Sequence, residues 1–420
     1  MKPLLIIFIF FNALSLPGQP PDIKKYFDLA EASFKERDNE SAYEYMHEAY
    51  KLHPYHQGVL YMKAKGAALT NRPDEALECL KKAIEINAGY SLAVPEFNKI
   101  KDLDGFKKLV DEQKKMNDPI IHSVNALVIK DRQLHTEGIA YDVEHQLFYL
   151  GSIHKRKIVV VKANGETADF CPSGFEGMTS VFGLTIDAKR KILWACTSPI
   201  AEMEKSDSTL RSAVYMFDLT TGKLLKKFKV SADEPDGTFG DLVIAPSGTV
   251  YISDSGKNRI FTVDEKQNDL VPFLSSKVFW NIQGLTFSDK GEDLFVADYI
   301  KGIFKVSIKS RFPIPVPAPE NFSLKGIDGI YYYHNSLVAI QNGVSPNRAT
   351  RYYLSDNGND IIKTEIIDRR HPAFGEPTLG VITGNSFYYI ANSQWDGYVN
   401  HKIKPAEKLK DIVVLKYTLQ

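Results

Sequence analysis

Three side chains with hard oxygen donors stand at matching points of a repeated sequence motif. Glu137, Gln283 and Asp328 each precede a glycine, and each glycine is followed by a short apolar run. Carboxylate and amide oxygens are the ligands that Ca²⁺ prefers, and the ion takes roughly six to eight of them, water included. If the repeats bring these three residues together, we expect them to form a divalent cation site.

The motif occurs six times and predicts the elements that would position these residues. Its copies read "EGIAYDVEHQLFYLGS", "FGLTIDAKRKILWACTS", "GDLVIAPSGTVYISDS", "QGLTFSDKGEDLFVADY", "DGIYYYHNSLVAIQNG" and "LGVITGNSFYYIANSQ". Each copy contains two alternating strands joined by a turn, and most continue into a third strand. Repeated meanders of roughly 40 to 50 residues are typical of a β-propeller. We therefore predict an all-β six-bladed propeller over residues 118–420, with a pair of β-sandwiches as the alternative.

The phase of the repeat predicts which side chains meet in the central channel. The first strand of each unit should line the channel, and the residue just before it should point toward the upper end. Those residues are Glu137, Phe182, Gly240, Gln283, Asp328 and Leu379. Two carboxylates and one amide therefore converge from separate blades. The strands in "NALVIKD" and "DIVVLKYTLQ" are expected to meet in one sheet and close the ring.

The propeller region also resembles a known family. The segments "EGIAYD", "GDLVIAPSGTVYISDSGKNRI" and "QGLTFSDKGEDLFVADY" are similar to the gluconolactonase and senescence-marker-protein propellers of the calcium-dependent phosphotriesterase-like superfamily. Paraoxonases, diisopropylfluorophosphatase and strictosidine synthase are more distant relatives. The resemblance implies calcium ligands at a Glu before blade 1, Asn residues before blades 3 and 4, and an Asp before blade 5.

Two of these four positions match the family pattern. Glu137 and Asp328 match the Glu and the Asp, and Gln283 keeps an amide oxygen at the second Asn position. Gly240 replaces the first Asn, although Asp241 follows it, and Asn281 is near enough in sequence to substitute. The structural alternative is that the acids are ordinary turn residues, since Asp is common in turns without a metal.

The resemblance implies a metal-assisted lactone or ester hydrolase. Bound Ca²⁺ would polarise a carbonyl or phosphoryl oxygen, and Asp328 would be the catalytic residue, as ligand and candidate base or nucleophile. His135, His154, His334 and His371 are the candidates for an assisting histidine. The competing hypothesis is a non-catalytic ligand- or protein-binding scaffold with a degenerate channel site, which Gly240 favours.

Further residues are candidates for binding a small molecule at the channel mouth. His154 lies in the turn "GSIHKRKIV", and Trp395 lies in "NSQWDGY" after a blade 6 strand. With Asn281 and Asp241 they form the predicted substrate-binding set, because polar and aromatic side chains suit a small polar or sugar-like ligand. They also suit plain loops.

The preceding residues, 20–117, have helical periodicity and an internal repeat of 34 residues. Ala42 and Ala49 recur as Ala76 and Ala83. This period, with small residues where helices cross, resembles tetratricopeptide repeats. Two units are clear, and a degenerate helical stretch follows them. The region is either a docking groove for a protein or peptide, or a helical cap or spacer.

The ends and composition of the chain bear on its location. "MKPLLIIFIFFNALSLPGQPP" predicts a signal peptide over residues 1–18, with a retained signal anchor as the alternative. We expect an exported protein, periplasmic or secreted, with no membrane span in the mature chain. Lys plus Arg equals Asp plus Glu at 52 each, which gives no basic field for nucleic acid. The three cysteines leave at least one free, and Cys171 and Cys196 either pair or are small core residues.

Overall fold

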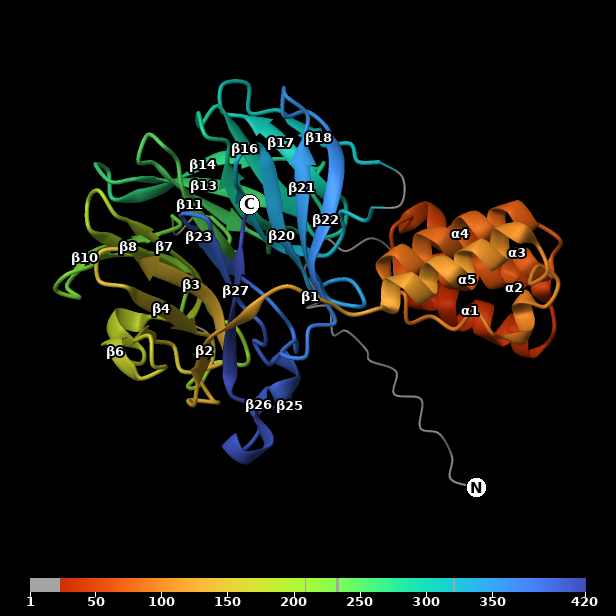
Figure 1. The fold of residues 1–420 in the computed structure, drawn as a ribbon, viewed down its shortest axis with the longest axis horizontal. Helices are drawn as coiled ribbons and strands as arrows, with labels where there is room; N and C mark the ends of the chain where they lie inside the picture. Colours follow the sequence, from red (N-terminus) through yellow and green to blue (C-terminus); the bar gives the residue numbers. More distant parts are fainter. Residues whose placement is uncertain (1–22, 208, 232–233, 320–321) are drawn as a thin grey trace. The chain divides into compact units, whose positions relative to one another are not determined.

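The computed structural model describes residues 23–207, 209–231, 234–319 and 322–420 (Figure 1). The predicted signal peptide lies outside these residues. The described residues form two compact units. One contains residues 23–83 and Ser91–Leu109, and the other contains Ile84–Tyr90 and the described residues from Val110 to Gln420.

The N-terminal part of the chain is helical, as predicted. Its helices are α1 (Ile23–Lys35), α2 (Asn39–Leu52), α3 (Gln57–Leu69), α4 (Pro73–Ile86) and α5 (Asp104–Asn117), with a 3₁₀ turn η1 at Pro95–Phe97. The degenerate stretch of the sequence forms η1 and α5.

Small residues lie where helices of the first unit pack closely. Ala42, Ala49 and Ala76 are fully buried. A Cβ on Gly66 of α3 would lie 2.9 Å from the Cα of Tyr43 in α2, so nothing larger fits there. These contacts agree with the helix-crossing role predicted for small residues, and assignment to tetratricopeptide repeats stays a prediction.

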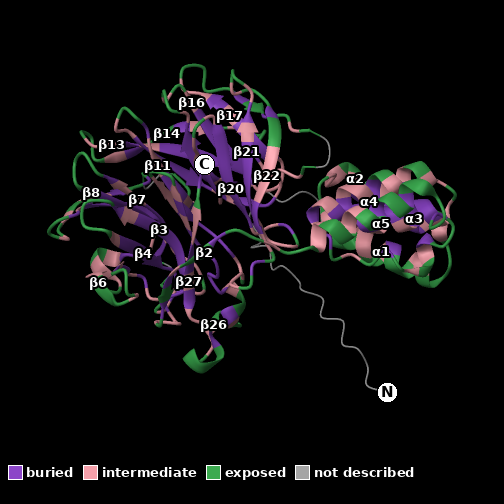
Figure 2. Cartoon of the chain, in the orientation of Figure 1, coloured by how far each residue is buried: buried purple, intermediate pink, exposed green. Residues whose placement is uncertain are grey.

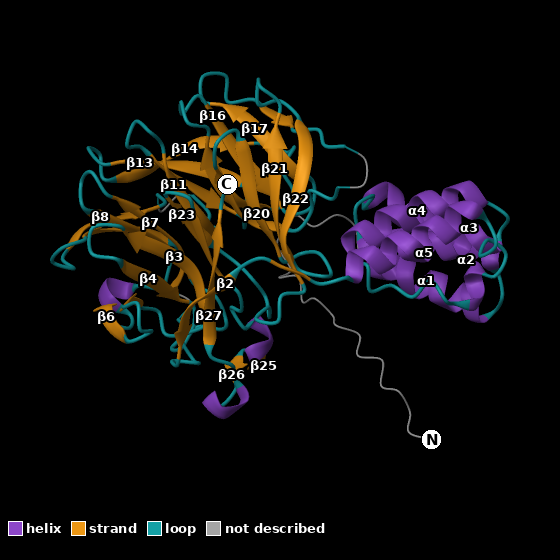
Figure 3. Cartoon of the chain, viewed as in Figure 1, coloured by secondary structure: helices purple, strands orange, loops and turns teal. Residues whose placement is uncertain are grey.

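The rest of the chain forms six radial sheets, and this confirms the six-bladed propeller (Figure 3). Blade 1 contains β3 (Thr136–Asp142), β4 (Leu147–Ser152), β5 (Ile158–Val161) and β6 (Thr167–Cys171). Blade 2 contains β7 (Ser180–Asp187), β8 (Ile192–Ser198), β9 (Ala213–Asp218) and β10 (Leu224–Lys229). Blade 3 contains β11 (Phe239–Ile244), β12 (Val250–Asp254), β13 (Arg259–Asp264) and β14 (Asp269–Ser275).

The remaining blades have the same inner-to-outer order. Blade 4 contains β15 (Ile282–Phe287), β16 (Asp293–Asp298), β17 (Gly302–Ser307) and β18 (Pro313–Pro315). Blade 5 contains β19 (Ile327–Tyr332), β20 (Ser336–Gln341), β21 (Arg348–Leu354), β22 (Ile361–Arg369) and β1 (Ile120–Ile121). Blade 6 contains β23 (Gly380–Thr383), β24 (Ser386–Ile390), β27 (Ile412–Thr418) and β2 (Val124–Ile129). Short 3₁₀ turns and a hairpin complete the fold: η2 (Phe175–Gly177), η3 (Trp395–Gly397), η4 (Ala406–Lys408), β25 (Tyr398–Val399) and β26 (Lys402–Ile403).

The ring closes on itself, and its core lies between the blades. Each inner strand contacts the inner strand of the next blade, and β23 returns to β3. Six apolar clusters each join two neighbouring blades, and the buried inner strands of the propeller are visible in Figure 2. Burying apolar side chains between sheets gives roughly 25 cal/mol per Å², so adjacent blades stabilise each other.

The closing sheet combines both ends of the propeller sequence, as predicted. Val128 of β2 is paired with Val413 of β27, and β27 is paired with β24 on its other side. The buried carboxylate of Asp368 in β22 supports this joint. It accepts hydrogen bonds from the Ser123 N–H at 3.1 Å and the Tyr389 hydroxyl at 2.7 Å.

A β-bulge near the start of five inner strands differs from the sequence prediction. In β3, Thr136 pairs with Ser152 and Ile139 pairs with Leu150, so two residues, Glu137 and Gly138, oppose one. The same shift occurs in β7, β11, β15 and β19. The predicted channel residues of these five blades therefore lie inside the strand rather than just before it. Bulges re-aim side chains in this way.

Two further expectations concern cysteines and membranes. Cys79, Cys171 and Cys196 are all free and buried, so the Cys171–Cys196 pair is not formed and the cysteines serve as small core residues. Among the helices that the structure describes, none is long and apolar enough to cross a membrane.

Candidate functional site

The bulges bring oxygen donors to the end of the channel where the inner strands begin, here called the upper end. Glu137, Gln283 and Asp328 are the first bulge residues of blades 1, 4 and 5. Second strands run antiparallel to the inner strands, so the residues that follow them reach the same end. Tyr299 and Asn342 arrive in this way from blades 4 and 5.

Glu137 is buried against aromatic side chains of the segment between β24 and β27 of blade 6, which contains η3 and β25. Its carboxylate accepts a hydrogen bond from the Trp395 indole N–H. The Trp395 ring packs edge-on against His135, with centroids 4.5 Å apart. His135 Nδ1 lies 2.5 Å from the Tyr398 hydroxyl. The structure therefore places the predicted residues Glu137 and Trp395 in direct contact.

Of the four candidate histidines, His135 packs directly behind this contact. Burial, with a smaller effect of His154, lowers the pKa of His135 to about 3, so its ring is neutral at physiological pH. His154 Nδ1 donates to the Glu202 carbonyl at 2.8 Å, and its ring lies 6.0 Å from that of Tyr398. His154 is thus linked to the site through Tyr398 and does not contact Glu137.

Asp328 is held by an amide that a tyrosine orients. The Asn342 side-chain amide donates to the Asp328 carboxylate at 2.8 Å. The Tyr299 hydroxyl donates to Asn342 Oδ1 at 2.9 Å. Because Asn342 is fixed on both sides, Asp328 is held in one orientation.

Gln283 and Asn281 form a second amide contact at this end. The Gln283 amide donates to Asn281 Oδ1 at 2.5 Å. A Cβ on Gly240 would lie 3.4 Å from Gln283 Oε1. This is an ordinary contact distance, so the Gln283 amide oxygen faces the position where the resembled family has Asn.

Three carboxyl groups at this end have raised pKa values, and we call Glu137, Asp328 and Glu376 the acid cluster. Burial, Asp328 and Glu376 raise the pKa of Glu137 well above its usual value. Burial raises the pKa of Asp328 to about 6, and burial together with Asp328 and Asp396 raises that of Glu376 to about 7. No Lys or Arg of the described residues contributes to any of these shifts. The cluster carries negative charge without a basic partner.

Glu376, Tyr299 and Asn342 are site residues that sequence reasoning did not single out. Glu376 lies in the connection from β22 to β23, which has no repeated motif. Tyr299 and Asn342 each follow a second strand, in "ADYIKG" and "IQNGV". Residues directly after each second strand could therefore have been predicted as site residues, because the end of that strand lies beside the start of the inner strand.

Asp241 lies apart from the acid cluster. It is the second bulge residue of β11, and its two oxygens accept hydrogen bonds from the backbone N–H groups of Leu242 at 2.8 Å and Leu285 at 3.2 Å. Its carboxyl group lines a cavity further along the channel. The structure therefore does not bring Asp241 together with Trp395 or His154.

The donors at the upper end fit a hard cation in part. Two carboxylates and an amide oxygen are the ligand types of Ca²⁺, and their excess negative charge would be offset by a cation. In the part of the chain that the structure describes, no group of three or more His, Cys, Asp or Glu is arranged to hold a metal ion. A cation would therefore be held by Glu137, Asp328, the Gln283 amide oxygen and water, and not by three acidic side chains.

Comparisons with known proteins give matches of limited extent. The family model described as Major royal jelly protein matches residues 179–310, less than half of the chain. No curated protein matches the chain significantly. Solved structures similar to it include a gluconolactonase from Xanthomonas campestris, with a TM-score of 0.48 and 12% identity over 71% of this chain and 90% of that chain.

Two other solved structures have comparable similarity. A luciferin-regenerating enzyme has a TM-score of 0.47 and 12% identity, over 72% of this chain and 96% of that chain. The PQQ-bound aldose sugar dehydrogenase from Streptomyces coelicolor has a TM-score of 0.45 and 15% identity, over 71% and 96%.

Proposed function

We propose that the upper end of the channel is a divalent cation site, with Ca²⁺ as the best-fitting ion, where a small lactone or ester is hydrolysed. The observation that carries this proposal is the acid cluster: one buried and two half-buried carboxyl groups, from blades 1 and 5 and the connection into blade 6, without a basic partner. Burying unpaired charge is costly. A cation between Glu137 and Asp328 would remove that cost.

Each residue has a distinct task in this proposal. Glu137, Asp328 and Gln283 would hold the ion, which when bound would polarise the carbonyl oxygen of the substrate. The Trp395 N–H orients Glu137, and the Asn342 amide orients Asp328. Asp328 is the candidate base or nucleophile. Glu376, with a pKa near 7, is suited to accept and return a proton at neutral pH.

A non-catalytic ligand-binding propeller is the second candidate, and Gly240 favours it. Gly240 supplies no oxygen ligand where the resembled family has Asn, and the Asn281 side-chain oxygen already accepts a hydrogen bond from the Gln283 amide. Such a site would bind a cation or ligand without turnover. Export, and docking of a protein or peptide on the helical repeats, stay predictions under either function.

Thermal unfolding of the purified protein with chelator and then with millimolar Ca²⁺ tests the cation site. A ligand at a hundredfold excess over its Kd stabilises the native state by about 2.7 kcal/mol. We expect Ca²⁺ to raise the Tm of the wild type, and Glu137→Gln and Asp328→Asn to abolish the rise. Asp289→Asn, at an exposed turn carboxylate of blade 4, is the matched control and should respond like the wild type.

Hydrolysis assays then separate the two candidates. A calcium-dependent Tm shift with turnover of lactones or aryl esters supports the hydrolase. The same shift without turnover of either class supports the binding protein. No shift in any form would refute the cation site, and with it the proposed catalytic function.

A further inference from the structure

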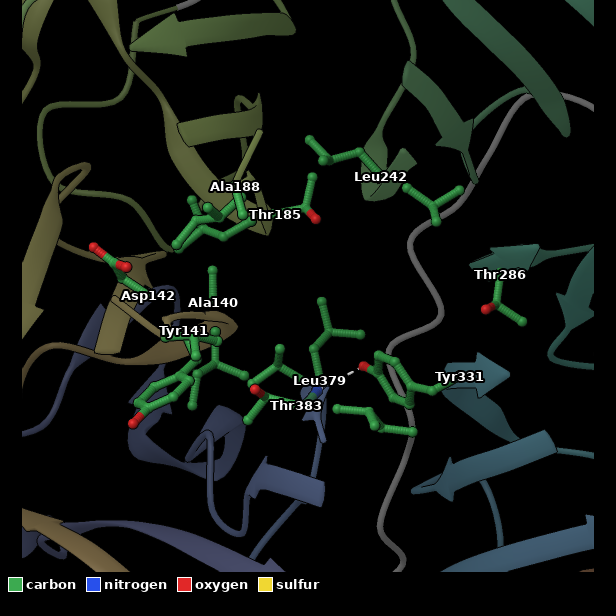
Figure 4. Close-up of a pocket in the computed structure, with 18 of the residues that line it drawn as sticks. Ala140, Tyr141, Asp142, Thr185, Ala188, Leu242, Thr286, Tyr331, Leu379 and Thr383 are labelled. Carbon is green, nitrogen blue, oxygen red and sulfur yellow. Dashed lines mark hydrogen bonds between the residues drawn. The ribbon is translucent and has the colours of Figure 1, made fainter. Parts of the chain in front are cut away.

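The channel contains a second compartment beyond the acid cluster. A cavity of about 600 Å³ lies between the inner strands of all six blades, toward the end where these strands finish (Figure 4). We call this the lower cavity. None of Glu137, Gln283, Asp328 or Glu376 lines it. Its volume falls within the roughly 300–1,000 Å³ of typical small-molecule pockets.

Aliphatic side chains form about half of the cavity wall. Ile139, Leu184, Leu242 and Leu285 come from four successive inner strands, and Val381 comes from β23. Contact with such a wall favours a hydrocarbon ligand, because burying apolar surface stabilises by roughly 25 cal/mol per Å².

Several hydroxyl groups also line the cavity, and their protons can form hydrogen bonds to a ligand. The Tyr331 hydroxyl accepts a hydrogen bond from the Gly380 N–H at 2.6 Å (Figure 4), and no acceptor for its own proton is found among the described residues. The Thr286 hydroxyl likewise accepts from the Tyr332 N–H at 2.9 Å. Thr185 and Thr383 add hydroxyls from blades 2 and 6. A bound hydroxyl or carbonyl oxygen would satisfy these donors.

The charged side chains of the cavity already have hydrogen-bonding partners. Both oxygens of Asp241 accept backbone hydrogen bonds. Asp142 contacts His145 at 2.6 Å, and Lys191 pairs with Glu144 at 3.0 Å. An anionic ligand would therefore lose its hydration without gaining a free counter-charge.

We infer that the lower cavity is a second binding site, for an uncharged molecule with a hydrocarbon part and a hydroxyl or carbonyl oxygen. Aliphatic walls hold the hydrocarbon part, and the Tyr331 hydroxyl donates to the oxygen. The lower cavity contains no residue of the acid cluster, so this inference can be tested independently of the proposed hydrolase.

Binding of the neutral fluorescent probe N-phenyl-1-naphthylamine to the full chain tests the site. We expect saturable fluorescence enhancement with the wild type. Thr185→Phe and Thr383→Phe fill the cavity from two blades and should weaken binding at least tenfold. Thr220→Phe, in the exposed β9–β10 turn, and Glu137→Gln, at the upper end, should bind as the wild type does.

Two further comparisons test the ligand chemistry without cavity-filling variants. 8-Anilinonaphthalene-1-sulfonate adds one anionic group to the same rings and should bind at least tenfold more weakly. 1-Naphthol should displace the neutral probe better than naphthalene does, and Tyr331→Phe should remove that difference.

Three results would overturn the inference. The first is no saturable binding of the neutral probe, and the second is wild-type binding by both cavity-filling variants. Equal binding of the anionic probe would overturn the assignment to uncharged ligands. If both cavity-filling variants fail to fold, the naphthol comparison on wild type and Tyr331→Phe decides the matter, since equal displacement by both competitors refutes the role of the hydroxyl.

Discussion

Glu376 shows how one residue links the stability of this propeller to pH. Its pKa rises from 4.5 to about 7 in the folded protein, mainly because it is buried and also because Asp328 is near. Between these values the folded state binds more protons than the unfolded state, so stability falls as pH rises through the window. Below pH 4.5 the group is protonated in both states and this penalty is absent.

Replacing the Glu376 carboxylate by an amide should therefore stabilise the protein at high pH alone. We expect Glu376→Gln to leave the Tm unchanged at pH 4 and to raise the free energy of unfolding at pH 8 by up to about 3 kcal/mol. Circular dichroism melts at both values, in chelator, measure this. Glu144→Gln, at an exposed carboxylate, is the control. A lower Tm of Glu376→Gln at pH 8 would contradict the prediction.

Gly240 is the position where a single side chain should complete the proposed cation site. The missing Cβ would lie 3.4 Å from Gln283 Oε1, an ordinary contact distance, so a side chain fits there. We expect Gly240→Asn to tighten Ca²⁺ binding about tenfold, which corresponds to about 1.4 kcal/mol, because it adds an amide oxygen. Calorimetric titration of Gly240→Asn against Gly240→Ala separates the added donor from the added bulk. Equal affinities would show that the introduced amide oxygen does not reach the ion.

The sequence located some residues of the upper end and not others, for a physical reason. Glu137, Gln283 and Asp328 occupy the same phase of a repeated motif, so the propeller symmetry places them at one end of the channel. Glu376 lies in a connection with no counterpart in other blades. Its proximity to Asp328 depends on the path of one loop, which periodicity does not encode.

At the scale of the elements, the bulges set where the channel side chains point. Alternation of apolar residues predicted the strands, but not the extra residue near the start of five of them. A bulge depends on the pairing of two strands, and in β3 the pair Glu137 and Gly138 opposes Gly151 alone. The periodicity of a single strand does not show how many residues of one strand oppose each residue of its partner. Predicted strand starts were therefore late by a few residues in these blades.

The glycines at the second bulge position make close contacts between blades. A Cβ on Gly138 would lie 1.9 Å from the Phe182 carbonyl oxygen, and one on Gly284 would lie 2.6 Å from that of Asp328. Both obstacles are backbone atoms of the next inner strand, which cannot move without opening the ring. At Gly240, the first bulge position, the nearest atom belongs to a flexible side chain.

Alanine substitutions should separate these two kinds of position. We expect Gly138→Ala and Gly284→Ala to lower the free energy of unfolding by about 1–3 kcal/mol or more, and Gly240→Ala to change it by less than about 1 kcal/mol. Urea unfolding followed by tryptophan fluorescence measures all three. Equal stability of Gly284→Ala and Gly240→Ala would show that the inner strands of blades 4 and 5 can separate at this contact.

At the scale of the whole propeller, closure was predictable because the strand-forming segments at its two ends lacked partners within their own repeats. The pairing of β2 with β27 confirms that prediction. The hydrogen bonds from Ser123 and Tyr389 to Asp368 were not predictable, because these residues lie 245 and 21 positions from Asp368 in the sequence. Such a contact follows from the closed ring and not from any local pattern.

The closing sheet should make ring integrity depend on the last strand more than on the helices. β27 lies between β2 and β24, so its loss leaves β2 without a partner, leaves β24 paired only with β23, and exposes two apolar clusters. A protein that begins at Asp118 keeps all six sheets. It loses the backbone bonds between the Ile86–Ala88 segment and Ser345, at 2.7 and 2.8 Å. We expect that protein to unfold cooperatively with a lower Tm than the full chain.

A protein that ends at Lys410 should lack a cooperative thermal transition in circular dichroism and bind 8-anilinonaphthalene-1-sulfonate through its exposed core. A sharp transition in the latter would show that five intact blades suffice, and that closure is not what makes this propeller fold as a unit.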